Sequence, residues 1–435
     1  RLSIEPDVDN SCFKLQVNAT GDSEATADIR LSDPDGNTVA SLQGVATGTP
    51  CTLPVNAPEL WSPEHPYLYD LNITLSSEGQ QTDAVKSYCG MRKIEVKNVD
   101  GTPRIFLNDT QIFQMGPLDQ GWWPDGLYTA PSDEALLFDI KAMKELGFNM
   151  IRKHIKVEPS RWYMHCDREG ILVWQDLPSP NLPAGHEAFA RQNFEEEAVR
   201  IIDAFENHPS IVQWVVFNEG WGQFDTERMT QVVIDKVSPQ SLVCCASGWN
   251  DAEIGDIKDS HSYPYPSCPI DQKRACVNGE YGGITLKVPG HIWPGGDFGY
   301  TAVETPEDFT VMFNDLADKI KDHYYYGLNA AVYTQLSDVE IEKNGIYTYD
   351  RRILKPYSPT GELKDKILEC INMPQSDVKI QPVVSTAKEH KYKWKFITED
   401  NAPRHWFSKG FDDSLWPKGT AAFGKSSLWN TQGLI

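Results

Sequence analysis

The stretch Ile211-Val212-Gln213-Trp214-Val215-Val216-Phe217-Asn218-Glu219 decides the fold. Its first seven residues are largely apolar and rich in β-branched side chains, which predicts a strand buried on both faces, as in parallel sheets covered by helices. The apolar run ends abruptly in an amide, Asn218, and a carboxylic acid, Glu219. In a barrel of parallel strands the chemistry lies where strands end and loops begin, so the same stretch also indicates a functional site.

Strand-like and helix-like segments alternate on both sides of this stretch. Ser132 can cap a helix that carries Leu136, Ile140 and Met143 on one face, and Gly147 ends it. Further strands are predicted at 111–116, 149–152, 171–174, 242–246, 256–261, 275–279 and 329–335, and further helices at 162–169, 187–207, 226–236, 307–323 and 361–371. Eight strands with helical connections predict a (β/α)₈ barrel over residues 99–373. The connections after the fifth and sixth strands are too short for full helices.

The segments that flank the barrel have a different pattern. Residues 1–98 contain short alternating strands such as Phe13–Val17 and Leu68–Leu75, separated by turn residues, which predicts a small β-sandwich. After residue 373 the sequence is polar, β-like and punctuated by Trp. It predicts a partial β domain over residues 374–435.

The composition excludes some classes of partner. The net charge of −22 opposes binding to nucleic acid, because an acidic surface repels phosphates. No apolar run reaches the roughly 18 residues that a membrane-spanning helix needs, so no membrane partner is expected. The 13 Trp residues suit a carbohydrate site, where aromatic faces stack on sugar rings, although each one can equally be a core residue.

The Cys residues and the start of the chain leave the compartment open. The nine Cys residues lack CxxC spacing, and Cys244 and Cys245 lie inside an apolar run, which favours buried thiols over a disulfide framework or a zinc site. The segment Arg1–Glu5 is polar and is not a signal peptide. A periplasmic or secreted location is expected if a leader has been removed, and a cytoplasmic one otherwise.

Two carboxylic acids are the catalytic candidates. Glu219 lies beside apolar walls and Trp221, which disfavour ionisation and suit a general acid, although the residue can instead cap or salt-bridge a loop. Glu280 ends the apolar strand that starts at Ala275, and Tyr281 can donate a hydrogen bond to it; the alternative is a plain turn. The two acids end the fourth and seventh predicted strands, and facing strand ends of a small barrel can supply the roughly 5–5.5 Å between carboxyl groups that glycoside hydrolysis with retention needs.

Other polar residues at strand ends are candidate substrate-binding groups. A guanidinium at the end of the second strand, Arg152, can hold the nucleophile ionised, or can form an ion pair at the barrel mouth. For Asp176 and His261, taken singly, a structural role is the better interpretation. The full candidate set is Asn218, Arg152, Asp119, Tyr263, His261, Trp221, Trp249 and Asp176. No spacing typical of metal ligands occurs, so neither a metal nor a cofactor is expected, although the many carboxylates leave room for a divalent or sodium ion.

Several motifs together resemble glycoside hydrolase family 2, which includes β-galactosidases, β-glucuronidases and β-mannosidases. They cover most of the chain and are specific in combination: Leu60–Tyr69, Gly90–Ile94, Asn149–Arg152, Asp167–Trp174, Asn218-Glu219 and Gly279–Gly282. The resemblance implies an immunoglobulin-like sandwich followed by a TIM barrel, and catalysis through a covalent glycosyl-enzyme intermediate.

The resemblance also implies roles for individual residues. Glu219 corresponds to the acid/base, Glu280 to the nucleophile and Asn218 to the residue that contacts the sugar 2-hydroxyl. Arg152 is expected near the nucleophile, and Tyr263 is expected to donate a hydrogen bond to Glu280.

Departures from the family pattern bear on the substrate. The β-glucuronidases carry an Asn-x-Lys motif for the substrate carboxylate, whereas this chain has Glu342 and Asn344 there, which disfavours glucuronides. The stretch Tyr333-Thr334-Gln335 replaces the Trp of many β-galactosidases. The family's N-terminal jelly-roll domain is expected to be absent, and the segment around Trp406 and Phe411–Trp416 resembles the start of a carbohydrate-binding domain.

The function predicted from the sequence is an exo-β-glycosidase acting on an oligosaccharide or glycoside, with β-galactosidase as the favoured activity. The alternatives are another β-glycosidase of the family, a β-mannosidase or β-glucuronidase, or a non-catalytic carbohydrate-binding protein. A homo-oligomer is compatible with the sequence.

Overall fold

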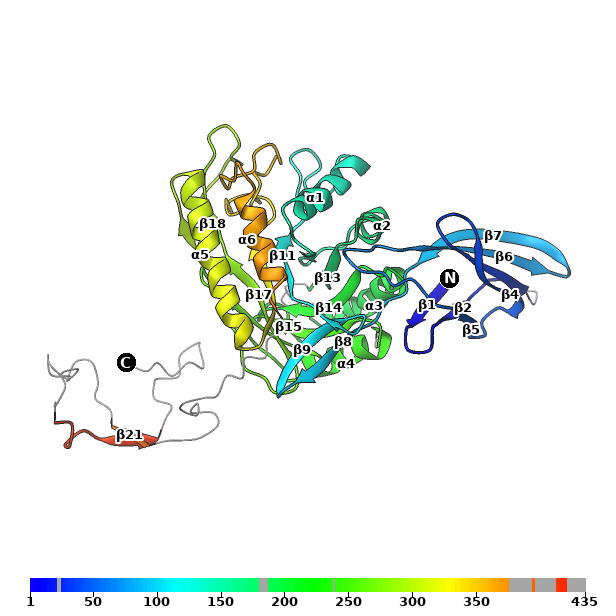
Figure 1. Ribbon diagram of the computed structural model, residues 1–435, viewed down its shortest axis with the longest axis horizontal. Helices are drawn as coiled ribbons and strands as arrows, with labels where there is room; N and C mark the ends of the chain where they lie inside the picture. Colours follow the sequence, from blue (N-terminus) through cyan, green and yellow to red (C-terminus); the bar gives the residue numbers. More distant parts are fainter. Residues whose placement is uncertain (22–24, 180–186, 238, 375–392, 396–411, 421–435) are drawn as a thin grey trace. The chain divides into compact units, whose positions relative to one another are not determined.

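The computed structural model describes residues 1–21, 25–179, 187–237, 239–374, 393–395 and 412–420 of the chain. The chain divides into two compact units, Arg1–Asp377 and Val378–Ile435. The first unit holds the N-terminal sheets and the barrel, which follow one another along the sequence colours of Figure 1.

The N-terminal part is a sandwich of two antiparallel sheets, as the sequence predicts. One sheet has the order β1 (Leu2–Asp7), β2 (Cys12–Val17), β5 (Cys51–Pro54); the other has the order β4 (Thr38–Ala46), β3 (Ala25–Ser32), β6 (Tyr69–Ser77), β7 (Gln80–Cys89). The alternating apolar residues of these strands, among them Phe13, Ile29 and Leu71, are buried in one shared core.

A small three-stranded sheet leads from the sandwich into the barrel. It consists of β8 (Ile94–Val99), β9 (Thr102–Leu107) and β10 (Thr110–Gln111). Arg104 of β9 donates to the carbonyl oxygens of Leu328 and Tyr324, each at 2.9 Å, so this sheet is fastened to the barrel wall. The boundary predicted at residue 98 falls within β8 and stays a prediction.

Eight parallel strands form the barrel, which confirms the predicted fold class. In hydrogen-bonded order they are β15 (Leu242–Ser247), β14 (Ile211–Asn218), β13 (Leu172–Asp176), β12 (Met150–Lys153), β11 (Gln114–Asp119), β20 (Leu328–Thr334), β17 (Ala275–Gly282) and β16 (Ile257–Ser262). β15 and β16 lie next to each other and complete the ring. All eight residues of β14 are buried, as expected for a strand covered on both faces. The short strands β18 (Ile284–Thr285) and β19 (Thr301–Ala302) pair outside the ring.

The described helices are α1 (Asp133–Glu145), α2 (Ser160–Glu169), α3 (Glu187–Phe205), α4 (Thr226–Val237), α5 (Pro306–Tyr325) and α6 (Glu362–Ile371), and α5 and α6 lie side by side in Figure 1. Ser132 caps α1 by accepting from the backbone N–H of Ala135 at 3.2 Å, as predicted. The connections that follow the fifth and sixth strands, residues 248–256 and 263–274, contain no helix. This confirms the prediction that they are too short for full helices.

Two of the sequence motifs meet where the sandwich contacts the barrel. Trp61 donates its indole N–H to the carbonyl oxygen of Asp167 at 2.8 Å, and Tyr88 donates to the carboxylate of Asp167 at 2.7 Å. Arg92 donates to the carbonyl oxygens of Pro209 at 2.9 Å and Ile211 at 2.7 Å. Because β14 begins at Ile211, these contacts fix the start of the strand whose other end carries the candidate site.

The second unit is described only in part. β21 (Lys393–Lys395) pairs antiparallel with β22 (Lys418–Thr420), and Lys395 forms an ion pair with Asp413 at 2.7 Å. Trp406 and Phe411 lie outside the described residues, so the predicted carbohydrate-binding segment stays a prediction.

Among the described helices, none is both long and apolar enough to cross a membrane.

Candidate active site

The candidate site lies at the carboxyl ends of the barrel strands. Asn218 ends β14 and Glu219 follows it, while His261 and Glu280 lie near the ends of β16 and β17. Because the strands are parallel, these ends meet at one rim. Glu219, His261 and Glu280 each present an atom within 4.8 Å of those of the other two. The two carboxyl groups predicted from separate strands therefore share one site.

Glu280 is buried and held by three neighbours. Tyr263 donates its hydroxyl to Oε2 at 2.6 Å, Arg152 donates Nη1 to Oε1 at 3.3 Å, and Nδ1 of His261 lies 3.4 Å from Oε2. Burial raises the pKa of Glu280, but the charges of His261 and Arg152 lower it by a larger amount, so the pKa lies below its ordinary value. Tyr281, a predicted donor, is instead buried in the core, and its hydroxyl has no partner among the described residues.

Arg152 organises the floor of the site. Its Nε and Nη2 donate to the two carboxylate oxygens of Asp176 at 3.1 and 2.9 Å, a bidentate pair that fixes the plane of the guanidinium. Nη2 also donates to Oδ1 of Asn218 at 2.8 Å, and Nη1 donates to the carbonyl oxygen of Gly279 at 3.0 Å. Because a guanidinium only donates, the atom of Asn218 that faces Arg152 is its carbonyl oxygen Oδ1 and not its NH₂ group.

Glu219 is aimed by an uncommon backbone conformation. Its φ angle is 53°, in the left-handed region that residues other than glycine rarely adopt. The backbone N–H donates to the carbonyl oxygen of Ser247 at 2.7 Å, and the side chain of Gln223 donates to the carbonyl oxygen of Glu219. The carboxylate contacts Nδ1 of His261 at 2.9 Å through Oε1 and accepts from the indole of Trp221 at 2.8 Å through Oε2. Local strain of this kind is typical of functional positions.

His261 links the two carboxyl groups to a buried acid. Its Nε2 lies 2.8 Å from Oγ of Ser247, which donates to Oδ2 of Asp259 at 2.6 Å. Oδ1 of Asp259 accepts from the backbone N–H of Gly279 at 2.6 Å, one residue before Glu280. Burial lowers the pKa of His261, but Glu280 and Glu219 raise it by more, so its pKa lies above the ordinary value.

Two models of domains from one known family match the chain. The model described as "Glycosyl hydrolases family 2" matches residues 1–92, and the model described as "Glycosyl hydrolases family 2, TIM barrel domain" matches residues 130–368, more than half of the chain. The chain belongs to glycosyl hydrolases family 2. The resemblance found in the sequence motifs is thereby confirmed.

Individual members of the family are similar at low identity. A β-galactosidase of Lactococcus lactis is 29% identical over 51% of this chain and 22% of its own length, and a β-glucuronidase of Bacteroides fragilis is 26% identical over 50% of this chain and 32% of its own. The crystal structure of a β-glucuronidase from Ruminococcus gnavus with D-glucaro 1,5-lactone has a TM-score of 0.66 and 17% identity, covering 84% of this chain and 67% of that one. The chain spans less than half of the length of these two sequence relatives.

Two of the acids predicted to bind substrate in this family 2 site are engaged within the protein. Asp119 is buried, forms an ion pair with Lys153 and accepts from the backbone N–H of Gly121 at 2.7 Å. Asp176 is occupied by Arg152 and also lies 3.0 Å from Nδ1 of His154. These contacts favour supporting roles, in line with the structural alternative for Asp176. Contact of either acid with a ligand stays a prediction.

The two predicted aromatic residues lie at the rim. The side chain of Trp221 is 63% exposed and that of Trp249 is 40% exposed, so each offers a face to solvent. The rings of Trp249 and His261 meet edge to face, with centroids 6.1 Å apart. Both aromatic residues therefore lie beside the carboxyl pair, and their contact with a sugar stays a prediction. The expectation that the site needs neither metal nor cofactor also stays a prediction.

Tyr300 belongs to the site but was not predicted. Its ring stacks on that of Tyr263, with centroids 3.5 Å apart and planes 3° apart, and it is 44% exposed. Burial and the nearby charges of Glu280, Glu342 and Glu219 raise the pKa of Tyr300 to about 12. The residue comes from the long connection between β18 and β19, where no periodic pattern marks it.

A third acid, Glu342, lies in an amide-lined corner of the same rim. Its Oε2 accepts from Gln335 at 2.8 Å and from Gln120 at 3.5 Å. Burial and the charge of Glu280 raise the pKa of Glu342, and no described cation forms an ion pair with it. Gln335 also donates to Oδ1 of Asn344 at 2.9 Å, so the two positions of the glucuronidase motif occupy one hydrogen-bonded corner.

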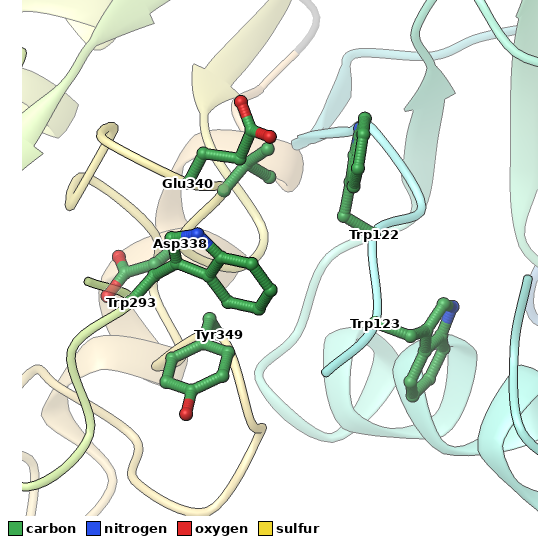
Figure 2. A pocket seen from close by; sticks show the side chains of 7 residues that line it. Trp122, Trp123, Trp293, Asp338, Glu340 and Tyr349 are labelled. Carbon is green, nitrogen blue, oxygen red and sulfur yellow. The ribbon is translucent and has the colours of Figure 1, made fainter. Parts of the chain in front are cut away.

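An aromatic recess lies beside this corner. Figure 2 shows Trp122 and Trp123 on one side and Trp293 and Tyr349 on the other; the turn that leads to Glu342 supplies Asp338, Val339 and Glu340. Trp293 and Tyr349 meet edge to face with centroids 5.5 Å apart. Trp123 is only 8% exposed and lies under the guanidinium of Arg351, 4.0 Å away, which favours a packing role for it.

Proposed function

We propose that this protein is a retaining exo-β-glycosidase that hydrolyses a terminal β-linked sugar, with β-galactosides as the favoured substrates. The observation that carries the proposal is the pair Glu219 and Glu280, which approach within 4.8 Å through one oxygen each. Retaining glycosidases separate their carboxyl groups by about 5–5.5 Å, whereas inverting ones leave roughly 6.5–9.5 Å for a water molecule. The short separation supports retention.

The electrostatics support a division of roles. Glu280, whose pKa is lowered by His261 and Arg152, attacks the anomeric carbon while Glu219 protonates the departing oxygen. The bond from the anomeric carbon to that oxygen breaks, and a glycosyl ester of Glu280 forms. In the second step Glu219 takes a proton from water, which attacks the same carbon and releases Glu280.

The remaining contacts support binding of one sugar ring. Asn218 turns its NH₂ group away from Arg152 and is the proposed donor to the sugar 2-hydroxyl. Trp221 and Tyr300 present exposed aromatic faces beside the carboxyl pair and suit the apolar face of a pyranose.

A panel of nitrophenyl β-glycosides tests the proposal. We expect turnover of the β-galactoside by the wild type, and loss of turnover in Glu219→Gln without loss of folding. A fluorosugar that traps the intermediate should label Glu280, as located by peptide mass spectrometry. Sugar binding by calorimetry without hydrolysis of any glycoside would favour the non-catalytic alternative, and a label on another residue would contradict the nucleophile.

β-Glucuronidase activity is the second candidate, because the relative from Bacteroides fragilis carries that name. Glu342 opposes it, because a substrate carboxylate would add a third negative charge beside Glu280 and Glu342. The same panel decides between them: faster cleavage of the nitrophenyl β-glucuronide than of the β-galactoside would replace the first assignment.

A further inference from the structure

The hydrogen-bond pattern of His261 locates a proton on Nε2. Ser247 has a single hydroxyl hydrogen, which it donates to Oδ2 of Asp259 at 2.6 Å. Its oxygen therefore acts as the acceptor in the 2.8 Å contact with His261, and Nε2 is the donor. Ser247 and Asp259 thus fix both the orientation and one hydrogen of the imidazole.

The other ring nitrogen faces two carboxylates. Nδ1 lies 2.9 Å from Oε1 of Glu219 and 3.4 Å from Oε2 of Glu280. A bare nitrogen lone pair here would point at acceptor oxygens on both sides, whereas an N–H donates to them. The arrangement therefore requires a second proton, which either sits on Nδ1 or is shared with the nearer oxygen, that of Glu219.

We propose that His261 is a positioning residue that shares one proton with Glu219, so that the acid of the first step is the His261–Glu219 pair and not Glu219 alone. The inference rests on the proposed function. The proton moves from Nδ1 to Glu219 and on to the departing oxygen, which leaves His261 neutral, Glu219 ionised and Glu280 esterified. In the second step the water proton returns through Glu219 to Nδ1 as Glu280 is released.

The charges around His261 couple this proton to the nucleophile. Burial lowers the pKa of His261, and among the groups that raise it Glu280 is the strongest, ahead of Glu219 and Asp259, while Arg152 lowers it. When Glu280 attacks the sugar and loses its charge, one of the two carboxylate charges beside Nδ1 disappears, and the imidazolium is stabilised less. His261 therefore gives up its proton as the glycosyl ester forms and regains it when Glu280 is freed.

Leaving groups of different acidity test the shared proton. In His261→Asn we expect roughly 100-fold loss of kcat on a phenyl β-galactoside, whose oxygen needs protonation, but little loss on the dinitrophenyl β-galactoside, because acid catalysis contributes about 10²–10⁴-fold. The basic limb of the kcat/KM profile should move down by at least about one pH unit, because a carboxyl alone releases its proton at lower pH than an imidazolium. Equal losses on both substrates with an unmoved basic limb would overturn the inference.

Two further measurements keep the outcome independent of folding defects. His165→Asn is the matched control: it removes a different His–carboxylate contact, 3.1 Å from Asp133 on the helical layer, and should change neither readout. NMR of isotope-labelled histidine in the wild type should show His261 protonated on both nitrogens near neutral pH and neutral once a fluorosugar has esterified Glu280. A neutral ring before labelling would overturn the inference. Failure of the wild type to cleave any glycoside would instead contradict the proposed function.

Discussion

Asp176 forms a bidentate ion pair with Arg152: its two carboxylate oxygens accept from Nε at 3.1 Å and from Nη2 at 2.9 Å, and both side chains are buried. The remaining nitrogen of the guanidinium reaches Glu280. Asp176, at the end of one strand, therefore helps to position the proposed nucleophile Glu280, near the end of another strand, without contacting it.

Asp176→Asn keeps the shape of this side chain and removes its charge. We expect a loss of about 3–5 kcal/mol in the free energy of unfolding near neutral pH, the usual effect of breaking a buried ion pair, together with reduced kcat. The pKa of Asp176 is lowered in the folded state, so its contribution is present above the unfolded value of about 4 and fades as the pH falls through the folded pKa. Denaturant unfolding at several pH values measures this, with the exposed Asp235→Asn as control. Equal losses for the two variants would contradict it.

Tyr263 supplies a hydroxyl that stabilises the ionised form of Glu280. In Tyr263→Phe the pKa of Glu280 should rise, and the acid limb of the kcat/KM profile should move up by roughly one to two pH units, because a hydrogen bond to a charged group contributes about 1.5–3 kcal/mol. The pH profile of Tyr265→Phe, an exposed neighbour in the same connection, provides the control. Reduced activity with an unmoved acid limb would show that Tyr263 orients the nucleophile without setting its charge.

Gly283 leaves room for the stacked pair Tyr263 and Tyr300. A Cβ atom at this position would clash with both rings, and the φ angle of Gly283 is +64°. An alanine at position 283 would therefore have two effects, backbone strain and a clash with the rings. Gly290 has a φ angle of +85° and open space around it, so alanine there adds only the backbone strain, roughly 1–2 kcal/mol. We expect both alanine variants to lower the melting temperature slightly and only Gly283→Ala to reduce kcat/KM, by about tenfold or more. Equal values of kcat/KM in the two variants would show that the stacked position of Tyr300 does not contribute to activity.

The strand ends of the barrel were predictable because burial on both faces leaves an unmistakable apolar run. Glu219 and Glu280 follow such runs, and Arg152 closes a shorter one, so the residues on the strands could be found without coordinates. The boundary predicted at residue 98 stays a prediction: β8 and β9 form a hairpin whose pattern matches the sandwich strands, and Arg104 of this hairpin donates to the barrel.

The rest of the site depends on loops and on partners distant in sequence. Tyr300 arrives through a connection without periodicity, so no local signal marks it. Asp119 ends a strand like the other candidates, but its pairing with Lys153 depends on the neighbouring strand. Likewise, the sequence places His261 at a strand end, whereas its carboxylate neighbours depend on the order of the strands: Glu280 lies opposite it on the paired strand β17, and Glu219 approaches only when the ring closes.

Glu342 and Asn344 offer the sharpest test of substrate class. The carboxylate of Glu342 rests on the amide groups of Gln335 and Gln120, and the nearby charge of Glu280 already raises its pKa. Replacing Glu342→Asn together with Asn344→Lys removes one negative charge and adds a positive one where β-glucuronidases carry Asn-x-Lys.

The double variant should therefore raise the ratio of kcat/KM for the nitrophenyl β-glucuronide over the β-galactoside by at least about tenfold, since a like-charge contact costs several kcal/mol and 1.36 kcal/mol already corresponds to a factor of ten. Glu340→Asn is the matched control, because it removes an equal charge from an exposed position in the same turn. The same rise in Glu340→Asn would assign the effect to the overall charge of the rim. An unchanged ratio in the double variant would mean that the Glu342 corner does not face the sugar.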